Sequence, residues 1–141
     1  MAVTAMITTG AFAGDRNPGT HTDIALNRME IQQQQRQNGD LQDNIGDQQQ
    51  QIFDLVKDKE ALQADLGSLQ LKRQQAADNG RSSKVARLDK KIDWDQALLA
   101  ANADNIRELL AAERNDMRLM NRNGERIKGE TAAIQRDRSN F

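Results

Sequence analysis

The sequence predicts an all-α protein: a long antiparallel two-helix coiled-coil hairpin with an apolar, irregular N-terminal segment, packed in a homo-oligomer. Three observations lead to this prediction. The composition is too polar for a broad core, and apolar residues recur with a heptad spacing in two segments of nearly equal length. The short sequence DNGRSS separates those two segments.

The composition allows only a narrow hydrophobic core. Apolar residues make up 37% of the 141 residues and aromatic residues 3%, whereas about 45–50% apolar residues are usual in a globular domain. Such a chain is either disordered or forms long helices that touch along a seam. Twenty basic residues balance twenty-one acidic ones, so the net charge of −1 provides no general attraction to nucleic acid or to an anionic membrane.

Residues 1–22 are predicted to form an N-terminal extension for packing between subunits. This segment contains the only proline and three glycines, a composition that disfavours a continuous helix. It has no basic residue before Arg16, so we expect no cleavable signal peptide. No apolar run in the chain reaches the roughly 20 residues of a transmembrane helix. We expect Met6, Ile7 and Phe12 to contact neighbouring subunits.

A heptad pattern predicts the first helix of the hairpin domain (residues 23–137) over residues 24–77. Every seventh residue from Ile24 and from Asn27 falls on one seam, and ten of these sixteen positions are apolar. This alternation of three- and four-residue steps is typical of a coiled coil. The apolar seam positions are Ile24, Ile31, Leu41, Ile45, Ile52, Leu55, Leu62, Leu66, Leu69 and Ala76.

The same period resumes over residues 83–137, where we expect the second helix, followed by a tail of residues 138–141. Seven of the eight positions spaced by seven from Val85 are apolar, the exception being Glu113. Further apolar residues broaden the face beyond a two-helix seam, so this helix is expected to contact more than one neighbour. These residues are Leu98, Leu110, Met117 and Leu119.

Residues 78–82 are predicted to form the turn at the tip of the hairpin, in preference to a continuous rod. Asn79 and Gly80 can adopt a positive φ and end the first helix, and Ser82 or Ser83 can cap the second. A turn here places Leu69 opposite Ile92. It also pairs polar seam positions with each other, namely Lys59 with Asn102, Gln48 with Glu113 and Asn38 with Asn123.

The open end of the hairpin is predicted to need a cover from another subunit. Each of its seam isoleucines faces a polar residue in this pairing. Phe53 and Trp94 lie outside the seam and would be exposed in a single hairpin, which also favours packing between subunits. Within the hairpin, the predicted self-assembly interface therefore comprises Ile24, Ile31, Phe53, Trp94, Ile127 and Ile134.

No catalytic, metal-binding or cofactor-binding residue is predicted, and we do not expect an enzyme. The chain has no cysteine, and its one histidine, His21, has no second histidine or cysteine to share a metal ion. A row of arginines at intervals of four residues could instead bind an acidic partner or follow phosphates. Interleaved carboxylates and the lack of stacking aromatics favour a protein contact or solvation over nucleic acid. The row is Arg114, Arg118, Arg122 and Arg126.

These features favour a non-enzymatic structural protein that self-assembles into a filament, tube or ring, in a secretion apparatus or a virus particle. The organisation is similar to that of needle and filament subunits of type III secretion systems, in which paired terminal helices build a tube. It also resembles the coiled-coil hairpin stalk of flagellar-type export. Both likenesses concern organisation, so they assign no role to any residue.

Two alternatives come from other functional classes. One is a coiled-coil adaptor or chaperone of a secretion system, and the other is a phage internal or ejection protein that contacts DNA or membrane. The expected location is a virion or an extracellular assembly exported by a specialised system, or else the cytoplasm. Self-assembly predicts large particles from the purified protein alone, whereas an adaptor is expected to stay small.

Overall fold

The computed structural model describes residues 21–139, and all of them except residues 79–81 are helical. Helix α1 (His21–Asp78) and helix α2 (Ser82–Ser139) have 58 residues each. They form a helical hairpin, as predicted, and the predicted helices over residues 24–77 and 83–137 fall within these bounds. Met6, Ile7 and Phe12 lie outside the described residues.

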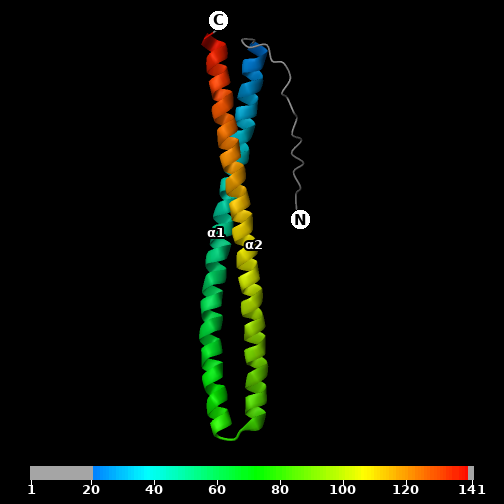
Figure 1. The fold of residues 1–141 in the computed structure, drawn as a ribbon, viewed down its shortest axis with the longest axis vertical. Helices are drawn as coiled ribbons and strands as arrows, with labels where there is room; N and C mark the ends of the chain where they lie inside the picture. Colours follow the sequence, from blue (N-terminus) through cyan, green and yellow to red (C-terminus); the bar gives the residue numbers. More distant parts are fainter. Residues whose placement is uncertain (1–20, 140–141) are drawn as a thin grey trace. The chain divides into compact units, whose positions relative to one another are not determined.

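The two helices contribute to two compact units. One comprises residues 37–122, and the other includes the described residues 21–36 and 123–139. Within residues 37–122 the helices lie side by side and antiparallel, and the short connection joins them at the tip (Figure 1, green).

The heptad positions of residues 37–122 are the positions that the hairpin buries. Every predicted seam residue in this unit is buried or half-buried, except Lys59. Leu69 and Ile92, which were predicted to be opposite, belong to one buried cluster with Ala76 and Leu88. The predicted antiparallel pairing is therefore consistent with the packing near the tip, whereas supercoiling of the two helices stays a prediction.

Polar seam residues pair slightly differently from the predicted pattern. Gln48 Nε2 donates a hydrogen bond to Asp116 Oδ2 at 2.9 Å. The carboxylate of Glu113, which was predicted to face Gln48, instead accepts a hydrogen bond from Gln49 Nε2 at 2.9 Å. Glutamine side chains are long enough to reach a carboxylate one turn away, so charge-assisted hydrogen bonds select the partner.

The connection ends α1 in a Schellman motif. Gly80 has a φ of 67° and is the only described residue with a positive φ. Arg81 N donates to Ala76 O at 2.9 Å and Gly80 N donates to Ala77 O at 3.0 Å, which satisfies two carbonyls at the end of the helix. The turn needs a residue with a left-handed backbone conformation at this position, and glycine adopts that conformation without a steric cost.

The start of α2 differs from the prediction that Ser82 or Ser83 caps it. The carbonyl of Arg81 accepts hydrogen bonds from Lys84 N at 3.1 Å and Val85 N at 3.0 Å, so Arg81 occupies the N-cap position. Ser82 is already the first helical residue. The Schellman motif uses Arg81 to close α1, and this leaves no residue between the two helices for a serine cap.

Two glycine-to-alanine substitutions are expected to change stability in opposite directions. Gly80→Ala should lower the free energy of unfolding by about 1–2 kcal/mol, because an L-residue is strained at this φ. Gly67→Ala should raise it by about 1 kcal/mol, since Gly67 is exposed within α1 and a Cβ there would meet nothing within 4 Å. Urea unfolding followed by circular dichroism measures both, and changes of the same sign would contradict the turn geometry.

Residues 21–36 and 123–139 bury their isoleucines within the single chain. Ile24 and Ile134 are each 8% exposed, and Ile31 and Ile127 are half-buried. Gln34, a buried polar residue of the same seam, donates from Nε2 to Glu130 Oε1 at 3.2 Å. The methylene groups of such long polar side chains can cover an isoleucine while their ends hydrogen-bond to each other. The isoleucine seam therefore offers little surface to a partner, and the large apolar side chains that stay exposed in these two segments are Leu26 and Met29.

Candidate interaction surfaces

Four large apolar side chains remain exposed near the middle of α1 and α2, within residues 37–122. Their exposed fractions are 53% for Phe53, 39% for Val56, 39% for Leu110 and 42% for Met117. We call these four residues the apolar ridge. Two of them come from α1 and two from α2, so the hairpin brings together residues that are far apart in the sequence.

A hydrogen bond between the helices indicates that the ridge residues share one side of the hairpin. Gln49 Nε2 and Glu113 Oε1 are 2.9 Å apart. Residues three or four positions apart lie on the same face of a helix. Phe53 is therefore on the face of Gln49, and Leu110 and Met117 are on the face of Glu113.

Two cationic side chains flank the apolar ridge. Lys57 Nζ lies 4.4 Å from the centroid of the Phe53 ring, a distance at which the ammonium group is attracted to the aromatic face. Arg114 follows Leu110 by one turn, and its Nε donates to Leu110 O at 3.2 Å. The ridge thus presents apolar groups beside two cations, and the Glu113 carboxylate on the same face is bound to Gln49.

An open groove of about 560 Å³ lies between α1 and α2, nearer the tip of the hairpin than the ridge. Its apolar lining consists of Leu55, Ala61, Leu62, Leu98 and Ala101. Its polar lining consists of Asp58, Asp65, Asn102 and Asn105. Because its ionisable side chains are both aspartates, we call it the acidic groove.

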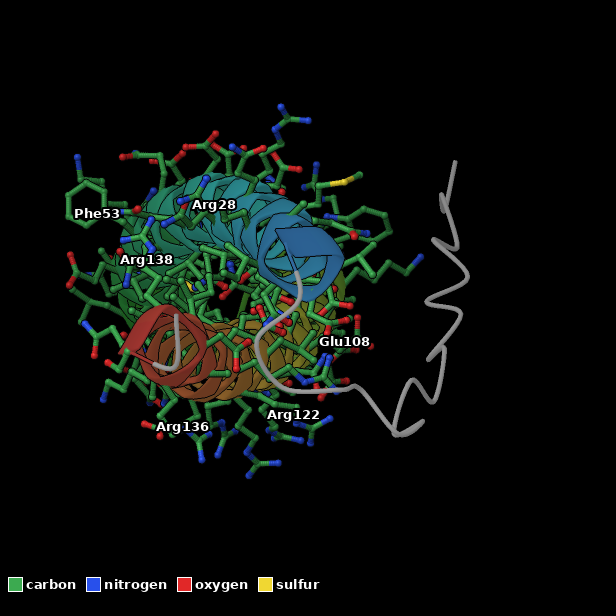
Figure 2. The ribbon with its side chains drawn as sticks, turned by 90° about the horizontal axis from the view of Figure 1, so that it is seen from above. Arg28, Phe53, Glu108, Arg122, Arg136 and Arg138 are labelled. Atoms are coloured by element: carbon green, nitrogen blue, oxygen red, sulfur yellow. The ribbon has the colours of Figure 1, made fainter. Side chains whose placement is uncertain are left out.

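The apolar ridge and the acidic groove face different sides of the hairpin. Each residue of an α-helix is rotated by about 100° from the one before, so Asp58 points roughly 200° away from Val56. Asn105 is likewise about 140° away from Leu110. Figure 2 shows Phe53 on one side and Glu108, one turn after Asn105, on the opposite side.

Asn102 places an unused hydrogen-bond acceptor at the acidic groove. Its side chain is 7% exposed, and Nδ2 donates to Leu55 O at 3.0 Å. Its Oδ1 atom has no hydrogen-bond partner among the described residues. Lys59, the residue predicted to lie opposite, is exposed and donates no hydrogen bond to this atom. Since this atom is buried, leaving it without a partner costs the hairpin stability.

Asp65 and Asp95 form a pair of carboxyl groups between the helices. Asp95 is 7% exposed and occupies a seam position. Burial raises the pKa of Asp95. The hydrogen bond that its protonated carboxyl group donates to Asp65, and the like charge of Asp65, raise this pKa further. Asp95 therefore holds a proton more readily than an isolated aspartate would.

The predicted arginine row does not form one straight stripe. Successive members are four residues apart, so each is rotated by about 40° from the previous one. Arg118 and Arg122 are exposed and make no hydrogen bond or ion pair with the described residues. Figure 2 shows Arg122 pointing away from α1. Arg126 belongs to the unit that contains residues 123–139.

The structure assigns Phe53 and Trp94 to different surfaces. Phe53 is part of the apolar ridge, whereas Trp94 is 68% exposed and lies one turn before Leu98, on the groove side of α2. The heptad pattern placed Leu98, Leu110 and Met117 on a broadened apolar face. It did not predict a role for Val56 or for the Asp65–Asp95 pair. An apolar residue at a position flanking the seam, as Val56 is, would have been the available signal.

Neither helix of the described chain has an apolar stretch sufficient to cross a bilayer. Within residues 21–139, no group of three or more histidine, aspartate or glutamate side chains is arranged to hold a metal ion. No protein-family model matches the sequence, and the searches of curated proteins and of solved structures find no significant match either.

Proposed function

We propose that the protein is a non-enzymatic structural protein whose hairpins pack side by side with copies of themselves. The proposed product is a filament, tube or ring, of the kind found in a secretion apparatus or a virus particle. The apolar ridge is the observation that carries this proposal. Clustered large apolar side chains on a surface are typical of interaction sites, whereas scattered ones are ordinary.

The ridge supplies a driving force for association. Full burial of a large apolar side chain is worth about 1.5–3 kcal/mol. The ridge side chains are already partly buried, so each would contribute roughly 1 kcal/mol when a neighbour covers it. Four such residues, with Lys57 and Arg114 beside them, make a surface of the kind that protein interfaces use: an apolar centre with a charged rim.

The proposal predicts that introducing charge into the ridge abolishes assembly. The purified protein should sediment as large particles, and Phe53→Glu combined with Leu110→Glu should convert these into single hairpins. Burying two carboxylates without partners should weaken association at least roughly 100-fold. Sedimentation velocity and negative-stain microscopy measure the outcome.

The matched control is Leu71→Glu. Leu71 is 62% exposed on α1, outside both the ridge and the groove, so this variant should assemble like the unmodified protein. If the unmodified protein is strictly monomeric at all concentrations, the adaptor hypothesis is favoured instead. Equal disruption by Leu71→Glu would show that the ridge is not the assembly surface.

A further inference from the structure

We propose that the acidic groove of one copy receives the apolar ridge of the next copy, so that the contact is head-to-tail rather than symmetric. This inference rests on the proposed self-assembly and names the two surfaces that contact each other in it. The occupant of the groove is thus a second copy of this chain, which presents Phe53 and Leu110 with Lys57 and Arg114 beside them.

Charge complementarity selects this pairing. The ridge is flanked by Lys57 and Arg114, and the carboxylate of Glu113 on that face already accepts a hydrogen bond from Gln49. The groove, in contrast, carries Asp58 and Asp65. A symmetric ridge-to-ridge contact would bring cations of one copy close to those of the other, and a groove-to-groove contact would do the same with aspartates. Like charges across an interface are unfavourable, and opposite charges both steer association and set the orientation.

Shape and hydrogen bonding agree with the charges. The groove has an apolar lining formed by Leu62 and Leu98, which suits the ring of Phe53 and the side chain of Leu110. Asp58 is exposed at the groove, so its carboxylate can accept hydrogen bonds. Arg114 uses only Nε inside its own chain, so its terminal guanidinium nitrogens can donate to an acceptor on a neighbour.

The positions of the two surfaces make the contact repeatable. The ridge and the groove lie on different sides of the hairpin, and the groove is nearer the tip, so a copy bound at one surface leaves the other surface free. A head-to-tail contact of this type continues from copy to copy. It closes into a ring if the rotation between neighbours allows closure and otherwise builds a filament.

Two variants provide the test, and each disrupts one of the two surfaces while leaving the other intact. The ridge variant is Phe53→Glu with Leu110→Glu, and the groove variant is Asp58→Lys with Leu98→Lys. Each variant alone should be monomeric. Mixed in equal amounts, they should form a 1:1 heterodimer, because the intact groove of the ridge variant can still bind the intact ridge of the groove variant.

Trp94 reports which groove is filled. The chain contains one tryptophan and no tyrosine, and Trp94 lies one turn from Leu98. With Trp94→Phe added to the groove variant, only the ridge variant fluoresces. Its emission should shift to shorter wavelength in the mixture, because the arriving ridge covers the groove margin, and should not shift when the ridge variant is mixed with itself.

The outcomes separate this inference from the proposed function. An unmodified protein that does not assemble overturns both. Assembly of the unmodified protein together with a mixture that stays monomeric, or with a groove variant that assembles normally, overturns the head-to-tail pairing alone. Circular dichroism verifies that the variants fold. If a charged variant unfolds, Phe53→Ser with Leu110→Ser and Asp58→Asn with Leu98→Asn provide a milder pair with the same expected result.

Discussion

Replacing Ile92 by alanine is expected to lower the free energy of unfolding by about 2–4 kcal/mol. Ile92 is 8% exposed and packs in the cluster with Leu69, Ala76 and Leu88. A hairpin has only two helices, so no third element can move in to fill the space that the lost methyl and methylene groups leave. The loss is therefore expected to include a cavity term as well as the lost burial.

Leu71→Ala is the matched control for this substitution. Leu71 is 62% exposed, so its truncation should change the free energy of unfolding by less than about 0.5 kcal/mol. Both variants should be compared by urea unfolding under conditions in which the protein is monomeric, since assembly would add to the apparent stability. Equal losses at both positions would contradict the assignment of the hydrophobic seam.

Asp95→Asn is expected to raise the melting temperature at pH 7, and this gain should shrink as the pH falls toward about 4. Burial and Asp65 raise the pKa of Asp95 in the folded protein, whereas the unfolded chain has the ordinary value of about 3.9. Above the raised pKa, the folded state holds an unfavourable charge, and the asparagine removes it.

The pH dependence follows from the sign of the shift. As the pH falls through the raised pKa, folded Asp95 takes up a proton before the unfolded chain does, so the stability of the unmodified protein rises. The recovery is complete once the pH is below the ordinary pKa of the unfolded chain. Thermal unfolding of both proteins between pH 7 and pH 4 measures the difference in their melting temperatures. Contributions from the other carboxyl groups are common to both proteins and cancel in this difference.

Asp93→Asn is the control, because Asp93 is exposed on the same helix two residues away. This substitution also removes one negative charge, but that charge is exposed. The change in melting temperature should therefore be small at every pH. A gain for Asp95→Asn that grew as the pH fell would contradict the raised pKa. A gain equal to that of Asp93→Asn would show that net charge, rather than burial, determines the effect.

The two helices and their connection could be predicted from the sequence because they depend on local patterns. The heptad spacing of Leu69, Ile92 and their neighbours marks the residues that the hairpin buries. Gly80 marks the end of α1, because a glycine suits the positive φ that the turn requires. Such signals act within a few residues of the chain, so they can be read without knowing what lies opposite.

The interaction surfaces were decided only by the tertiary structure. The sequence treated Ile24 and Ile134 as uncovered, whereas both are 8% exposed within the chain. The apolar ridge, the acidic groove and the Asp65–Asp95 pair each combine residues of α1 with residues of α2. Which side chains meet beside a seam depends on how two antiparallel helices align and rotate against each other. The free energies that set this rotation come from packing across the hairpin, and no single segment of the sequence contains them.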